Sequence, residues 1–161
     1  MPDDRKRTRR VEEFLDYRFE DVRLMRCALT SPGWINEHPT SGWPTYKALE
    51  WQGEPVLHLA LTEIMVAAGE AMTTGSATWV RDRLKSNALL AERAAEALWP
   101  VLFLGRGERS HNAQQGWTSY VAASVEALIG AVWFDATASG ATPMPTARRV
   151  VLKTLGLGTG K

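Results

Sequence analysis

The amino-acid sequence predicts a single all-α domain, and three observations support this fold class. Apolar residues recur mostly three or four positions apart, which is the spacing of one face of an α-helix. No stretch alternates apolar and polar residues for long enough to predict a β-sheet. The 161 residues, of which 45% are hydrophobic and 23% charged, suffice for one domain that folds without a disulfide or a metal.

The first ten residues are expected to form a basic tail ahead of a domain that spans 11–161. They contain five basic and two acidic residues, whereas the rest of the chain has a net charge of −2. The basic side chains are candidates for contacts with phosphates, and a solvated, frayed terminus is the alternative interpretation. They belong to Arg5, Lys6, Arg7, Arg9 and Arg10.

The first predicted helix covers 19–29, where the apolar residues fall on one face. Residues 31–45 contain three prolines and two glycines, a composition typical of a loop. A second helix is expected from about Thr45 to about Gly69. It is followed at 73–76 by a turn whose hydroxyl side chains suit the start of a helix.

Four more helices are expected in the second half of the chain. The third of them is apolar nearly all round, which predicts a buried central helix. A polar segment with three glycines, 105–116, is expected to be a loop in front of it. The four helices are expected at 77–85, 87–99, 118–134 and 145–155.

Cysteine content and hydropathy predict a cytoplasmic location. The single Cys27 excludes a disulfide framework and a zinc site made of several cysteines, and it suits a reducing compartment. No run of about 20 uninterrupted apolar residues is present, so we expect no membrane span. The charged N-terminus is not followed by the apolar region of a secretory signal.

Glu126 is a carboxylate inside the most apolar predicted helix. Burying an unpaired ionised carboxylate costs on the order of several kcal/mol. A buried carboxylate therefore normally has a cation, a metal or a hydrogen-bond network as its partner. Glu126 is therefore a candidate site residue. The alternative is a position on a solvent-facing stripe or a pairing with a neighbouring arginine.

Glu50 and Glu54 lie four residues apart on one face of the second helix, and His58 continues that face. The two carboxylates form either a solvated surface pair or a ledge for a divalent metal. His58 by itself is interpreted as a half-buried histidine or as a ligand. Gly53 and Pro55 within the helix favour a site, because Pro55 removes one helical hydrogen bond and is expected to kink the helix.

Five ordered blocks of the sequence resemble the ribonuclease III endonuclease domain family. Their order and spacing make the resemblance specific, and it extends almost from end to end. The blocks are ALTSPGWINE at 28–37, similar to ALTHRSYxNE; TYKALEWQGEPVL at 45–57, similar to NYERLEFLGDAVL; 81–94, similar to RxxLVSNxxLAxxA; GRGE at 105–108, similar to GxGE; and VAASVEALIGAVWFD at 121–135, similar to LADAFEALIGAIYLD.

The resemblance implies an all-α domain that forms a symmetric homodimer and acts on double-stranded RNA. In the family, acidic residues from two helices hold Mg²⁺ or Mn²⁺, which activates a water for attack on a phosphodiester. The first signature Glu falls on Lys47, the second is kept as Glu50, and the signature Asp is replaced by Glu54. The Asp of the second helix falls on Ala123, while the last Glu is kept as Glu126. We therefore expect weak or absent metal binding.

The resemblance also bears on partners. Trp51 stands where the family has an aromatic residue that enters a socket of the partner subunit, so we expect it at a dimer interface. The alternative is a Trp51 that packs within its own chain. Family enzymes usually carry a further domain that binds duplex RNA, whereas this sequence stops at Lys161. Affinity for RNA is therefore expected to be poor unless the basic tail supplies it.

Three functions remain open at this point. The missing acids favour a non-catalytic homodimer that binds RNA or a protein. A divergent metal-dependent endonuclease of double-stranded RNA is the second possibility. The third is a repurposed enzyme that uses the old cleft for other acid–base chemistry. For all three we expect the acidic side chains to converge, and the residues concerned are Glu50, Glu54 and Glu126, joined by His58 in the third.

Overall fold

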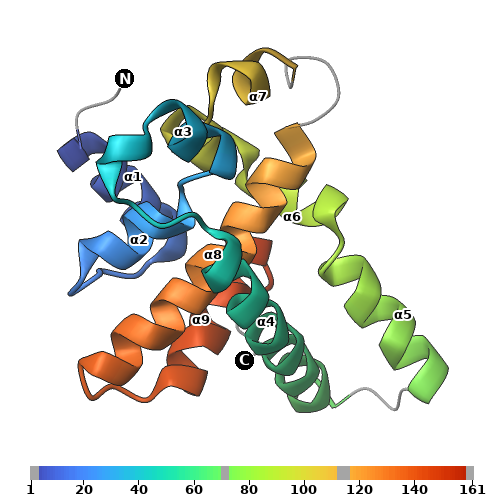
Figure 1. Ribbon diagram of the computed structural model, residues 1–161. Coiled ribbons are helices and arrows are strands. Elements are labelled where there is room, and N and C mark those ends of the chain that lie inside the picture. The colour runs from blue at the N-terminus through green and yellow to red at the C-terminus, as the bar shows by residue number, and fades with distance from the viewer. Residues whose placement is uncertain (1–3, 70–72, 112–116, 159–161) are drawn as a thin grey trace.

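The computed structural model describes residues 4–69, 73–111 and 117–158, which fold into a bundle of α-helices (Figure 1). Within these ranges the only β-type pairing is an isolated bridge between Thr30 and Phe103. The predicted all-α fold is therefore confirmed. The helices are α1 (Asp4–Leu15), α2 (Val22–Ala28), α3 (Pro32–Glu37), α4 (Lys47–Ala67), α5 (Thr74–Leu84), α6 (Asn87–Leu98), α7 (Arg106–His111), α8 (Trp117–Ala138) and α9 (Pro143–Leu155), with short 3-10 turns at Pro39–Ser41 and Trp99–Val101.

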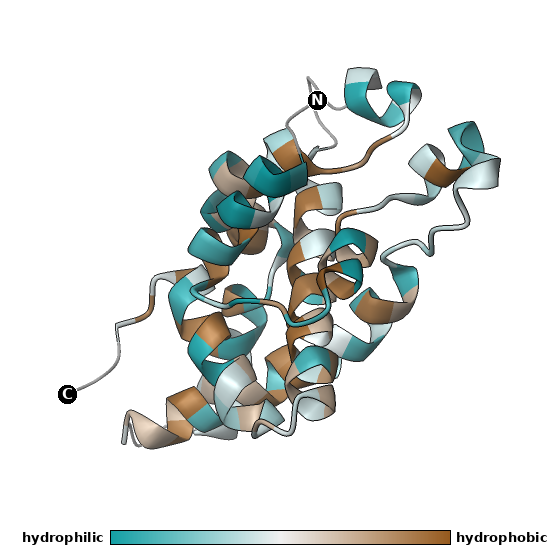
Figure 2. Ribbon diagram, turned by 90° about the vertical axis from the view of Figure 1, so that its left-hand side faces the viewer, coloured by the Kyte–Doolittle hydropathy of each residue, from teal (hydrophilic) through white to brown (hydrophobic). Residues whose placement is uncertain are grey.

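Helix α8 is the centre of the bundle. It is buried along most of its length, and α2, α4, α6 and α9 pack against it. Figure 2 shows the apolar residues concentrated along this inner helix. By length and composition α8 would qualify as a membrane span, but 72% of its most apolar stretch is buried within the fold, as in a core helix.

Two glycines bring the backbones of α4 and α8 into contact. A Cβ atom added at Gly53 would lie 1.8 Å from the carbonyl oxygen of Glu126, and one at Gly130 would lie 2.5 Å from that of Leu49. The close crossing explains why glycine stands inside two long helices. It also places the start of α4 against the middle of α8. Helix α4 continues to Ala67, so Pro55 does not end it.

The expectation of a basic tail at residues 1–10 is wrong for residues 4–10, because these residues form the first turns of α1. Val11 and Leu15 bury the inner face of this helix. Arg7 lies on the same face and is only 3% exposed. Its Nε donates to the carbonyl of Val101 at 3.0 Å, and its guanidinium lies 3.9 Å from the centre of the Phe103 ring. Arg7 is thus part of the packing and is not available to a phosphate.

Two other arginines of α1 also have partners within the fold. Arg10 donates to the carbonyls of Glu96 at 2.6 Å and Ala97 at 2.9 Å, in the last turn of α6. A cation is stabilised there because it meets the negative end of the helix dipole. Arg9 pairs with Glu13 at 2.7 Å on the surface of α1. This helix was not predicted because its buried face includes an arginine and so shows no regular apolar spacing.

The expectation that 31–45 and 105–116 are loops throughout is also wrong, because each segment contains a short helix. Helix α3 begins where the Ser31 hydroxyl accepts the N–H of Trp34 at 3.2 Å, with Pro32 in its first turn. Helix α7 occupies the first part of the other loop, whose residues 112–116 lie outside the described ranges. Prolines and glycines around these short helices made them look like loops.

Candidate active site

A cavity of about 380 Å³ opens between the first turn of α4 and the first half of α8. Helix α4 contributes Lys47 and Glu50 to its lining. Helix α8 contributes Ala123 and Glu126, which lie one turn apart and share a face. The structure thus brings together two of the three predicted carboxylates and both of the positions where the family acids are missing.

Glu50 already has a cation as its partner. Its Oε2 accepts from Nζ of Lys47 at 2.9 Å. The Glu50 side chain is only 24% exposed, so water screens this pair less than a pair on the open surface. The same ammonium lies 5.1 Å from the centre of the Tyr46 ring, whose face also attracts a cation.

The surroundings of Glu126 shift the pKa of its carboxyl group strongly upward. Burial raises its pKa to about 7, and the carboxylates of Glu54 and Glu50 contribute further. The ammonium groups of Lys85 and Lys47 act in the opposite direction but do not cancel the effect. Near neutral pH, Glu126 therefore exists in both protonation states.

Glu54 and His58 lie outside the cavity and face each other. Oε1 of Glu54 is 3.8 Å from Nε2 of His58, and the Glu54 side chain is 52% exposed. Burial, followed by the nearby Lys85 ammonium, lowers the pKa of His58, so the imidazole is neutral at pH 7. The charge of Glu54 reaches Glu126, but its carboxylate does not join the lining.

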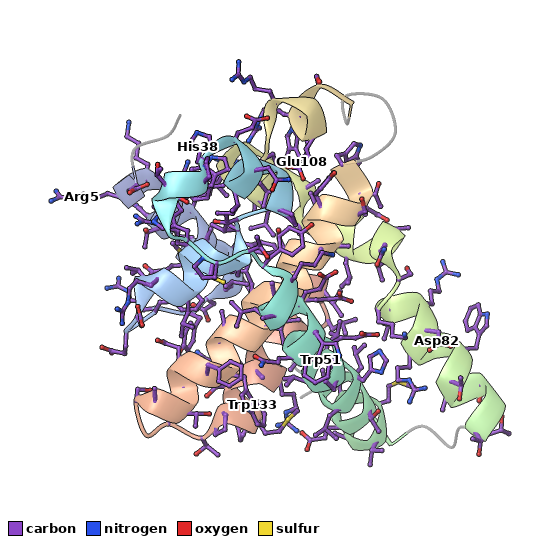
Figure 3. All side chains as sticks on the ribbon, viewed as in Figure 1. Arg5, His38, Trp51, Asp82, Glu108 and Trp133 are labelled. Atoms are coloured by element: carbon purple, nitrogen blue, oxygen red, sulfur yellow. The ribbon has the colours of Figure 1, made fainter. Side chains whose placement is uncertain are left out.

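Glu108 lines the same cavity, and its role was not predicted. Its carboxylate accepts from the Ser31 hydroxyl, from the N–H of Gly33 at 3.1 Å and from the N–H of Gly105 at 2.8 Å. A Cβ atom at Gly33 would lie 2.3 Å from its carboxyl carbon. Glu108 belongs to α7 and thereby joins the start of this helix to the start of α3 (Figure 3). The GRGE block was the only sequence signal for this contact.

Trp51 projects from the outer side of α4 (Figure 3). It is 76% exposed, so it does not pack within its own chain. Leu59 and Val66 on the same helix are exposed as well, at 50% and 75%. Helix α4 therefore presents Glu50 to the cavity and leaves Trp51 and Leu59 exposed on the outside.

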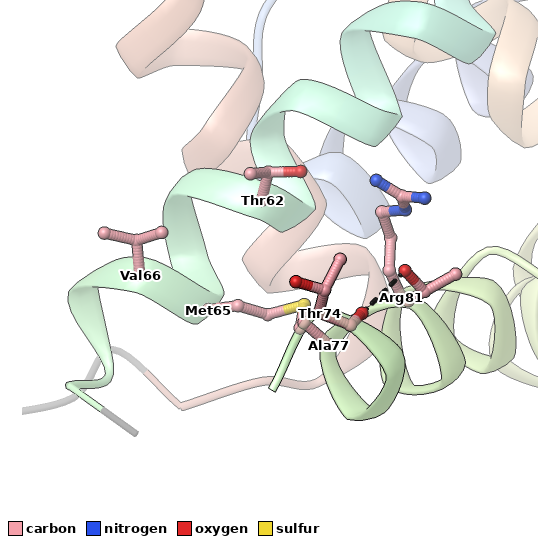
Figure 4. Close-up of a pocket in the computed structure, with 7 residues that line it drawn as sticks. Thr62, Met65, Val66, Thr74, Ala77 and Arg81 are labelled. Atoms are coloured by element: carbon pink, nitrogen blue, oxygen red, sulfur yellow. Dashed lines mark hydrogen bonds between the residues drawn. The ribbon is translucent and has the colours of Figure 1, made fainter. Parts of the chain in front are cut away.

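A second cavity of about 380 Å³ lies between the last turns of α4 and helix α5 (Figure 4). Of the residues that the structure describes, threonines, apolar side chains and Arg81 line it, and none of these is a carboxylate. One of its threonines is internally satisfied, since the Thr78 hydroxyl donates to the carbonyl of Thr74 at 2.8 Å. This cavity is separate from the acidic one and does not carry the candidate chemistry.

The comparisons with known proteins agree with the sequence motifs. The model of a family described as ribonuclease-III-like matches residues 21–154. Ribonuclease 3 of Oleidesulfovibrio alaskensis is 35% identical over 127 residues, which are 78% of this chain and 55% of that protein. The chain belongs to the ribonuclease III-like family. Ribonuclease 3 of Variovorax paradoxus is 34% identical over 132 residues, which are 81% of this chain and 54% of that protein.

The relatives place this chain against part of a larger protein. It spans about half the length of the ribonuclease 3 proteins that it matches. Two structures of the nuclease domain of ribonuclease III from Campylobacter jejuni share the fold. Their TM-scores are 0.77 and 0.76 at 21% and 22% identity. The first match covers 95% of this chain and 96% of that one, and the second covers 91% and 94%.

Ribonucleases of this family depend on a divalent metal, and the residues present here do not fit one. Magnesium needs near-octahedral oxygen ligands. In this cavity Glu50 is paired with Lys47, and position 123 offers only a methyl group. Among the described residues, no group of three or more His, Cys, Asp or Glu side chains is arranged to hold a metal ion.

Proposed function

We propose that this protein is a non-catalytic ribonuclease III-type domain that binds double-stranded RNA as a homodimer without cutting it. The RNA ligand follows from the family, whose fold and motif order the chain retains. The loss of catalysis follows from the cavity, where two acidic positions carry Lys47 and Ala123. Magnesium and manganese are then not required by this protein.

The observation that carries the proposal is the ion pair between Lys47 and Glu50. Its 2.9 Å length puts an ammonium group on a carboxylate at one of the positions that the family uses to hold metal. Ala123 removes an acid from the facing helix of the same cavity. A metal that activates water needs several fixed oxygen ligands, and this arrangement leaves too few of them.

The homodimer is supported by the outer side of α4. Trp51, Leu59 and Val66 are large apolar side chains that the isolated chain leaves exposed on one helix. Large exposed apolar patches mark interaction sites, and a tryptophan is a frequent anchor at the centre of an interface. A second copy of the chain would cover this side of α4 symmetrically.

The test is an assay of binding and cleavage with the same RNA. Labelled duplex RNA is incubated with the protein and Mg²⁺ or Mn²⁺, in parallel with Glu50→Ala and Glu126→Ala variants. We expect a gel-shift complex, intact RNA and no difference between wild type and variants in the products. Cleavage that either substitution abolishes would contradict the proposal, and absence of binding would overturn its RNA part in favour of a protein partner.

A second candidate function is a repurposed enzyme in the same cavity, and one observation favours it. General acid–base catalysts work best with a pKa near the working pH, and the pKa of Glu126 is about 7. Tyr120, Ser119 and Asn87 add polar groups to the lining. In this case the RNA assay gives neither a complex nor products.

A further inference from the structure

We propose that the Lys47 ammonium takes the place of a divalent ion in the acidic cavity. It balances the carboxylate charge that a divalent ion balances in related nucleases, and replacing Lys47 and Ala123 with acidic residues restores metal binding. This inference rests on the proposed function, since it explains how the cavity came to lack a metal. It concerns the chain's own side chains and adds a site property, the exclusion of divalent cations.

The position of the ammonium group supports this role. Lys47 is the first residue of α4, and Glu50 lies one turn further along on the same face. Nζ is held between two groups that both favour a positive charge, the Glu50 carboxylate at 2.9 Å and the Tyr46 ring at 5.1 Å. Tyr46 is buried, so its ring is a fixed surface for the cation to rest on.

The remaining carboxylates of the cavity leave a divalent ion with little to bind. Glu108 is engaged by the Ser31 hydroxyl and by two backbone N–H groups. Glu126 offers oxygen ligands from α8. Glu50 offers them from α4 only if Lys47 moves away. An entering metal would have to displace one cation that is covalently part of the protein and would then sit beside it.

The same geometry makes the exclusion reversible. The Lys47 side chain is 59% exposed, so substitutions there leave the core intact. Ala123 lines the cavity one turn before Glu126, and an aspartate there would place a carboxylate on the same face. The double change Lys47→Glu with Ala123→Asp removes the ammonium and adds two carboxylate groups.

The experiment is a calorimetric titration of the purified chain with Mn²⁺ alone. The variants are Lys47→Gln, Lys47→Glu and Lys47→Glu/Ala123→Asp. The matched control is Lys153→Glu, which makes the same charge change on the exposed surface of α9 away from this cavity. Melting curves with and without Mn²⁺ give a second readout. If Ala123→Asp prevents folding, the two single Lys47 variants still decide the question.

Wild type and the control should bind Mn²⁺ equally weakly. Removing the ammonium with Lys47→Gln should tighten binding about threefold to tenfold, and the double variant should tighten it by about a hundredfold. Unchanged affinity in both single Lys47 variants, or an equal gain in Lys153→Glu, would overturn this inference. Failure of the proposed function is a different result, namely RNA cleavage by the wild-type chain.

Discussion

At the residue scale, the sequence predicted where the acids lie better than how they are oriented. Glu50 and Glu126 line one cavity because the helical period fixes the faces of α4 and α8. Glu54 was expected beside them. It lies 3.8 Å from His58 and outside the lining of the cavity, but its charge acts on Glu126. Glu108 was missed for two reasons. Ser31 and Gly33 lie far from it in the sequence, and the N–H groups of Gly33 and Gly105 belong to the backbone, which no side-chain pattern reveals.

Replacing Glu126 with Gln tests its perturbed pKa. Folding raises this pKa from 4.5 to about 7, mainly through burial. The folded state therefore holds its proton more tightly than the unfolded state, and the contribution of Glu126 to stability is lost as the pH rises from about 4.5 through 7. Because the group is only partly buried, we expect wild type to lose about 1–2 kcal/mol relative to Glu126→Gln between pH 4.5 and 8.

Urea unfolding at the two pH values measures this difference. The control is Glu92→Gln on the exposed surface of α6, which should follow wild type at both pH values. Equal stability of wild type and Glu126→Gln across the whole range would show that the side chain is solvated and that the cavity is less closed than described.

Cys27 offers a second test at this scale. It is buried in α2, and its thiol lies 3.3 Å from the carbonyl of Thr45. Burial raises the pKa of this thiol to about 11, so almost no thiolate is present at pH 8. We expect a thiol-specific reagent to label the native protein only as fast as the protein unfolds, and to label it at once in urea. Rapid labelling without urea would contradict the packing around α2.

At the element scale, the strongly periodic helices were predicted and the short or arginine-rich ones were not. The prediction of helices at 118–134 and 145–155 is confirmed by α8 and α9, within a few residues at each end. Helix α1 was missed because most of its residues are charged and only Val11 and Leu15 mark its buried face with Arg7. Helices α3 and α7 have six residues each, too short for the period to show.

The crossing of α4 and α8 predicts the effect of adding one methyl group. Alanine normally favours a helix over glycine by about 1 kcal/mol. At Gly53 the new Cβ would collide with the Glu126 carbonyl at 1.8 Å, so Gly53→Ala should destabilise the fold by about 3 kcal/mol or more. Gly75→Ala in α5, where nothing lies within 4 Å, should be neutral or slightly stabilising.

Thermal and urea unfolding of the two glycine variants give the comparison. If Gly53→Ala were as stable as Gly75→Ala, the backbones of α4 and α8 would have to lie further apart. The start of α4 would then move away from α8, and the cavity that both helices line would no longer have the described form.

At the scale of the whole molecule, the family could be predicted from the sequence but the state of its site needed the fold. Five motif blocks in order indicated a ribonuclease III-like chain, and the match over residues 21–154 confirms it. The departures at Lys47 and Ala123 were visible in the same blocks. Whether Lys47 faces the cavity depends on how α4 packs on α8, which no local pattern fixes.

The oligomeric state tests the outer side of α4. Light scattering coupled to size-exclusion chromatography should give twice the chain mass for wild type. Trp51→Glu should give a monomer, because a charge replaces the apolar anchor at the centre of the proposed interface. Val22→Glu changes another exposed apolar residue on α2 and should remain dimeric. A monomeric wild type, or a dimeric Trp51→Glu with native melting, would contradict the homodimer.

The central claim is that this cavity has too few free oxygen ligands to hold a catalytic metal, and a crystal soaked in millimolar Mn²⁺ tests it most directly. Anomalous scattering identifies any bound manganese. We expect no ordered ion between Glu50 and Glu126, and we expect the Lys47 ammonium still on Glu50. An ordered manganese ion coordinated by both glutamates, with Lys47 turned away, would contradict the account.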